Sequence, residues 1–194
     1  TEYVQKDPQL ALYAEHMNML MIENDSTLAE FKLSISQKYK RHRPRLLILL
    51  GNPALLMRDE YRELWGDIPI VLCSEENYLG PQETYTKKQA IATADRTPLT
   101  QLADPYNMVL LYSNLYLDEN IQLICHIVPE IKKFIFIGDA RQINQTNNLD
   151  IRNKLKNTHP NVEYQFITPQ DMTTNQLLDS LYFVDPKTTG VLFS

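Results

Sequence analysis

Short apolar runs that stop abruptly at small or polar residues recur along the chain. Residues 46–50, 68–73 and 134–137 are the clearest examples. These runs are too short for buried helices and do not alternate with polar residues. The pattern therefore predicts strands that are buried on both faces, as in a parallel sheet. Because ligands of open α/β sheets bind beyond the carboxyl ends of the strands, the residues after each run are the first candidates for a site.

Helical periodicity fills the segments between the runs. A helix is expected from about residue 25 up to Pro44, with Thr27 and Glu30 as a capping box. Its apolar face consists of Leu28, Phe31, Ile35 and Tyr39. Further helices are predicted at 53–66, 118–129, 148–156 and 174–182, and further strands at 10–14, 106–112, 162–167 and 190–193. Residues 74–105 are weakly patterned and predict a long loop with one helical piece at 87–94.

The alternation of strands and helices predicts an α/β protein with parallel sheets and right-handed crossovers. With 194 residues, the chain is long enough for one sizeable domain or two small α/β lobes. Thr1 and the strand-like end at Ser194 both look like cut ends, so we expect the chain to be part of a longer protein.

The charge of the chain narrows the class of partner. A net charge of −5 argues against a nucleic-acid binder, which would need a basic face. The basic cluster at 38–45 lies at a predicted helix end, where the helix dipole stabilises cations. We favour this structural role over a phosphate- or lipid-binding patch. No apolar stretch approaches the roughly 20 residues that span a bilayer, so we expect no membrane insertion by this segment.

Several kinds of chemistry lack a motif in this sequence. Neither phosphate-binding glycine pattern is present, nor is the G-x-S-x-G elbow, and the four histidines have no metal-ligand spacing. We therefore expect no cofactor, no metal and no catalytic residues. Cys73 and Cys125 are interpreted as buried free thiols, with a disulfide in an oxidising compartment as the alternative.

Polar residues at the predicted strand ends are the candidate ligand-binding residues. They offer amides, carboxylates, an aromatic ring and the N–H groups of a helix start, which together suit a small polar ligand. The candidates are Gly51, Asn52, Glu75, Glu76, Asn77, Tyr78, Gly138 and Asp139. Structural alternatives stay open: a plain turn at Gly51, a solvated loop acid at Glu75 or Glu76, and a turn cap at Asp139.

Three segments carry a family resemblance. Residues 45–55 (RLLILLGNPAL), 67–72 (DIPIVL) and 119–134 resemble successive segments of periplasmic-binding-protein-like domains. The nearest similarity is to the ABC-transporter substrate-binding-like sensor regions of hybrid two-component histidine kinases, and it covers most of residues 10–194. The resemblance implies two Rossmann-like or flavodoxin-like lobes of the type I arrangement, incomplete at both ends. Residues 1–112 would form the first lobe and 113–194 a partial second lobe, with a ligand cleft between them.

The resemblance also implies a function. The chain would be the extracytoplasmic, periplasmic sensor domain of an inner-membrane histidine kinase. It would bind a small polar ligand such as a saccharide, signal to a kinase on its C-terminal side, and form a homodimer as a further option. One alternative is a dimerisation or protein-interaction domain with a degenerate cleft, which a filled cleft would favour. The other is a glycosyl-processing enzyme that uses Glu75, Glu76 or Asp139.

Overall fold

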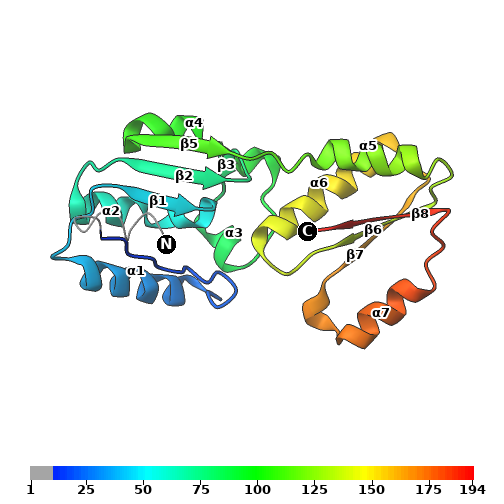
Figure 1. Cartoon of the computed structure of the whole chain (residues 1–194), viewed down its shortest axis with the longest axis horizontal. Helices are drawn as coiled ribbons and strands as arrows, with labels where there is room; N and C mark the ends of the chain where they lie inside the picture. The colour runs from blue at the N-terminus through cyan, green and yellow to red at the C-terminus, as the bar shows by residue number, and fades with distance from the viewer. Residues whose placement is uncertain (1–10) are drawn as a thin grey trace.

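The structure is a computed structural model of the chain, and it describes residues 11–194 apart from the side chain of Asp171. It confirms the predicted α/β class: the protein is built on two three-stranded parallel sheets. The sheets lie one after the other along the long axis, each with its own helices (Figure 1). We call residues 11–112 the N-terminal unit and residues 117–194 the C-terminal unit; residues 113–116 connect them.

The N-terminal unit contains the sheet β1-β2-β5 and a small antiparallel pair, β3-β4. Its elements are α1 (Asp25–Tyr39), β1 (Leu47–Leu50), η1 (Asn52–Met57), α2 (Arg58–Trp65), β2 (Ile70–Ser74), β3 (Tyr78–Leu79), α3 (Gln82–Thr86), η2 (Thr93–Asp95), β4 (Thr97–Pro98), α4 (Thr100–Ala103), η3 (Asp104–Tyr106) and β5 (Met108–Tyr112). One face of the sheet forms a core with these helices, through buried residues such as Leu28, Leu55 and Leu72.

The C-terminal unit contains the sheet β7-β6-β8 with helices on both faces (Figure 1). Its elements are α5 (Leu117–Ile127), β6 (Lys133–Ile137), α6 (Gln142–Thr158), β7 (Glu163–Ile167), η4 (Pro169–Asp171), α7 (Thr174–Tyr182) and β8 (Thr189–Phe193). Phe134 and Phe136 pack against Ile121 of α5 and Ile151 of α6. On the opposite face, Ile135 and Ile137 pack with Leu177 and Leu181 of α7.

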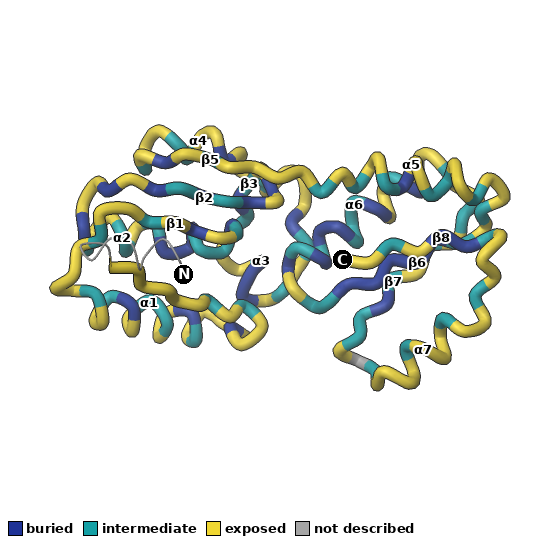
Figure 2. The backbone as a smooth tube through the Cα atoms, in the orientation of Figure 1, coloured by how far each residue is buried: buried dark blue, intermediate teal, exposed yellow. Residues whose placement is uncertain are grey.

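The prediction of strands buried on both faces is right for one run and wrong for another. Residues 134–137 in β6 are buried on both faces. In β1, Ile48 and Leu50 are 57% and 77% exposed, because no helix of the described residues covers the second face of that sheet. Figure 2 shows this difference as exposed stretches along β1 and β5 and a buried stretch along β6.

Other element predictions need correction. The strand predicted at 10–14 falls partly outside the described residues, and residues 11–14 are irregular and exposed. The helical piece predicted at 87–94 lies earlier, as α3, and α6 begins six residues before the predicted start. The first helix is capped by Asn24, with Thr27 as the third residue of its capping box rather than as the cap. In the other helices and strands, the predicted and observed ranges overlap.

Candidate functional site

The carboxyl ends of the two parallel sheets face each other where the units meet. β1 and β2 point from the N-terminal unit towards the C-terminal unit, and the end of β8 lies near the same boundary (Figure 1). The segments that follow β1 and β2 contain buried polar side chains, which are Asn52, Ser74 and Glu76. The first turns of α6 contribute buried Gln142 and Thr146. The predicted region at the strand ends is therefore a polar contact between the two units.

Asn52 ties the end of β1 to the segment after β2. Gly51 makes the turn with a positive φ of 85°, and its N–H donates to the carbonyl of Cys73 at 2.8 Å. The Asn52 amide then donates to the carbonyl of Tyr78 and, at 3.4 Å, to Oε2 of Glu76. These contacts hold residues 76–78 in place, so Asn52 acts within the N-terminal unit.

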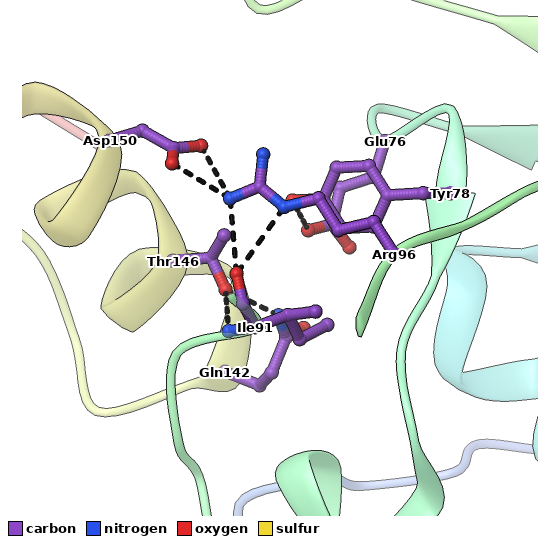
Figure 3. Close-up of polar contacts among 7 residues, drawn as sticks. All are labelled: Glu76, Tyr78, Ile91, Arg96, Gln142, Thr146 and Asp150. Atoms are coloured by element: carbon purple, nitrogen blue, oxygen red, sulfur yellow. Dashed lines mark hydrogen bonds and ion pairs between the residues drawn. The ribbon is translucent and has the colours of Figure 1, made fainter. Parts of the chain in front are cut away.

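Glu76, Tyr78 and Arg96 form a packed group on the N-terminal unit. The Tyr78 hydroxyl donates to Oε1 of Glu76 at 2.8 Å. The Arg96 guanidinium lies over the Tyr78 ring, 4.6 Å from its centroid, in a cation–π arrangement. Arg96 also donates from Nε and Nη2 to the carbonyl of Ile91, at 3.3 and 3.1 Å. The guanidinium is thus fixed in direction and points at the other unit (Figure 3).

Helix α6 presents one polar stripe to Arg96 and Ile91 of the N-terminal unit. Gln142, Thr146 and Asp150 are spaced four residues apart, which places them on one face of the helix. Nη2 of Arg96 contacts both carboxylate oxygens of Asp150, at 2.7 and 2.9 Å (Figure 3). Oγ1 of Thr146 accepts from the Ile91 N–H at 3.0 Å and from the Gln142 amide at 2.7 Å. Backbone and side chains of both units thus join in one network.

The candidates after β6 have a local role in this structure. Gly138 is buried, and a Cβ on it would lie only 3.1 Å from Cγ of Asn144, so the residue allows a close approach to α6. Asp139 accepts from the Arg141 N–H at 2.9 Å and from the Asn144 amide at 2.8 Å. The first of these contacts closes a side-chain turn just before α6, and the second ties Asp139 to the first turn of that helix. Both residues position the helix that carries the polar stripe.

The structure separates the other predicted residues by burial. Asn52 and Glu76 are buried and Tyr78 is half-buried, whereas Glu75 and Asn77 are exposed. The sequence interpretation missed Arg96, Gln142, Thr146 and Asp150. Arg96 lies in the weakly patterned segment 74–105, where no periodicity or motif marks it as a candidate. The four-residue spacing of the α6 stripe was a usable signal.

Charge at the contact is set by burial and by Arg96. Burial raises the pKa of Glu76, although hydrogen bonds from Tyr78 and Gln142 and the charge of Arg96 act in the opposite direction. Burial and the neighbouring Glu76 charge also raise the pKa of the Tyr78 hydroxyl. Burial disfavours the charge on Arg96, yet the hydrogen bond and the charge of Asp150 leave its pKa raised. Arg96 is therefore a fixed cation between two carboxyl groups.

Replacing Glu76 by Gln is expected to change how stability depends on pH. Because the pKa of Glu76 in the folded chain is raised above its ordinary 4.5, the native state binds this proton more tightly than the unfolded state does. The contribution of Glu76 is complete below pH 4.5 and is lost as the pH rises through the folded pKa. In Glu76→Gln this loss is absent. The free energy of unfolding of the variant, relative to that of wild type, therefore rises with pH.

Urea unfolding at a series of pH values from 4 to 8 measures this effect. Glu75→Gln is the matched control, since the neighbouring side chain is exposed, and it should keep the wild-type profile. A Glu76→Gln profile parallel to that of wild type across the whole range would contradict the assignment.

The contact between the units is filled by side chains that touch directly. Two surface hollows lie on the N-terminal unit. The larger one, of about 300 Å³, is lined by residues such as Lys32, Arg58 and Gln82, and also by Asp95 and Thr97, the neighbours of Arg96. Within residues 11–194, no group of three or more His, Cys, Asp or Glu side chains could hold a metal ion. Cys73 and Cys125 are both free and half-buried. No helix in the described part of the chain is long and apolar enough to cross a membrane.

Two comparisons with known proteins identified no relative of this chain. No family model matches the chain, and a search of curated proteins finds no significant match. Functional inference therefore depends on the contact between the units and on the chemistry of its side chains.

Proposed function

We propose that this chain is the extracytoplasmic sensor domain of a membrane-anchored, two-component histidine kinase. It binds a small polar ligand of the saccharide class between two periplasmic-binding-protein-like lobes and passes the signal to a kinase on its C-terminal side. The observation that carries this proposal is the polar network of Glu76, Tyr78 and Arg96 with Gln142 and Asp150, placed where strand ends of the two sheets face each other.

The composition of the network supports a hydroxyl-rich ligand. Sugar hydroxyls both donate and accept hydrogen bonds, and the network offers carboxylates, amides and a guanidinium close together. The Tyr78 ring adds an apolar face of the kind that packs against the C–H groups of a sugar ring. A ligand that takes over the partners of Arg96 and Asp150 would change the free energy of the contact between the units, which is the requirement for a signal.

Titration calorimetry with a panel of monosaccharides, disaccharides and amino acids tests the proposal. We expect at least one saccharide to bind the wild-type chain, and Gln142→Ala to weaken that binding by about tenfold or more, as the loss of a buried hydrogen-bonding group predicts. Gln145→Ala is the matched control, because Gln145 lies on the same helix but outside the polar stripe. If no member of the panel binds the folded chain, the small-ligand proposal fails.

A second candidate is a dimerisation or protein-interaction domain in which this contact is purely structural. It is favoured by the direct contact of side chains from both units, above all the two Arg96–Asp150 distances below 3 Å and the bond from Ile91 to Thr146. In that case Gln142→Ala should lower stability with no ligand effect to measure. The same calorimetric panel therefore separates the two candidates.

A further inference from the structure

The uncovered face of the N-terminal sheet presents a regular array of apolar side chains. The register places Ile48 beside Val71 and Val71 beside Val109 in one row. A second row runs through the next outward positions of the same strands, two residues further along. We call this array the outer grid; it consists of Ile48, Val71, Val109, Leu50, Cys73 and Leu111.

The outer grid is unusual for a parallel sheet. Sheets of this kind have apolar side chains on both faces because both faces are covered. The C-terminal unit follows this rule, with α5 and α6 on one face and α7 on the other. In the outer grid, however, Leu50 is 77% exposed, Val109 60% and Leu111 55%. With Leu46 at the border, the exposed apolar area is roughly 500 Å², at the level that marks an interaction surface.

We propose that a second copy of this chain covers the outer grid, so that two sheets stack face to face about a two-fold axis. Two such surfaces with their borders would bury on the order of 1,000 Å² in total, which reaches the lower limit for a specific interface. Flat apolar sheet faces stack well at a separation of about 10 Å. The grid contains no charged side chain, so its burial strands no charge.

The charges around the grid favour an antiparallel arrangement of the two copies. Exposed Arg43 and Arg45 precede β1 at the amino end of the sheet and outnumber the exposed Asp67 before β2, whereas exposed Glu75 follows β2 at the carboxyl end. A two-fold axis that makes the strands of the copies antiparallel places each basic end near the acidic end of the partner. Such an axis crosses all three strands between the two rows of the grid, so Cys73, in one of these rows, lies close to Cys73 of the other copy. This surface is independent of the proposed ligand site.

Sedimentation velocity over a concentration series tests the proposal. The wild-type chain should sediment as a dimer of twice its 22.6 kDa mass, and Leu50→Glu/Leu111→Glu should be monomeric, with a dimer Kd raised at least about 100-fold because two charges per copy would be buried. Leu178→Glu is the control: Leu178 on α7 is 58% exposed, like Leu111, but lies outside the grid. It should leave the dimer intact.

Two further measurements keep the test decisive if the charged variant misfolds. The milder Ile48→Thr/Val109→Thr should raise the dimer Kd by about tenfold. In a Cys125→Ser background, a short bis-maleimide should join Cys73 of the two copies, whereas a chain with Cys73→Ser should not cross-link. A wild-type chain that stays monomeric at every concentration, or a dimer unaffected by both grid variants, would overturn the proposal and leave the grid to a different partner.

Discussion

Phe136→Ala is expected to lower the free energy of unfolding by about 3–5 kcal/mol, the range found when a large side chain is removed from a packed core. Phe136 is fully buried in the central strand of the C-terminal sheet. Its ring stacks on that of Phe166, with centroids 5.4 Å apart and an interplanar angle of 21°. Neighbours from α6, including Ile151 and Leu155, enclose it, so the structure has little freedom to close the cavity.

Urea unfolding followed by two signals measures this effect and locates it. Trp65, the single tryptophan, is buried in the N-terminal unit, so its fluorescence reports that unit, while far-UV circular dichroism reports both. The variant should separate the two transitions, with the circular dichroism change beginning at lower urea. Phe193→Ala in β8 is the control, because Phe193 is 73% exposed, and it should cost below about 0.5 kcal/mol. A loss under 1 kcal/mol for Phe136→Ala would contradict the packing described.

The α/β class could be predicted from the sequence because its signals are local. Each strand has its own apolar run, and most helices have their own apolar face, so the alternation is visible without tertiary contacts. The range of α7 was predicted in full for the same reason. The start of α6 was missed because its first two turns present Gln142 and Thr146 to a polar contact. Apolar periodicity does not detect a helix face that is buried against polar groups.

The exposure of the outer grid could not be predicted from the sequence. The run 46–50 is as apolar as the run 134–137, since both are suited to burial on two faces. Whether a face is covered depends on elements distant in sequence, and α7 covers only the C-terminal sheet. The wrong prediction for Ile48 and Leu50 is thus informative. It marks a surface whose composition suits burial but which no part of residues 11–194 covers.

The residues at the contact between the units could be predicted only in part, for a similar reason. The strand-end rule led to Glu76 and Tyr78, which lie beside Arg96 at the contact between the units, and to Asn52, which holds residues 76–78 in place. It does not lead to Arg96 or Asp150, because one lies in a loop and the other in the middle of a helix. Their pairing depends on how the two units meet, which no local pattern encodes.

Arg96→Ala is expected to lower the free energy of unfolding by about 2–3 kcal/mol, because it removes several interactions of one mostly buried side chain at once. The Ile91 carbonyl loses two donors, Asp150 loses its cation, and Glu76 loses a nearby positive charge. Arg96→Lys should recover only part of the loss, since an ammonium group cannot reproduce the planar contacts to Ile91 and the Tyr78 ring.

A double-mutant cycle with Asp150→Ala isolates the bond between the units. We expect a coupling energy of about 1–2 kcal/mol, because the side chains of Arg96 and Asp150 are only 17% and 34% exposed. Lys87 and Glu83 form the control pair: their distance of 3.0 Å is similar, but their side chains are 55% and 61% exposed, so their coupling should stay below about 0.5 kcal/mol. Equal coupling in the two cycles would mean that the Arg96–Asp150 pair behaves as a surface ion pair. The contact between the units would then be too weak to hold them together or to respond to a ligand.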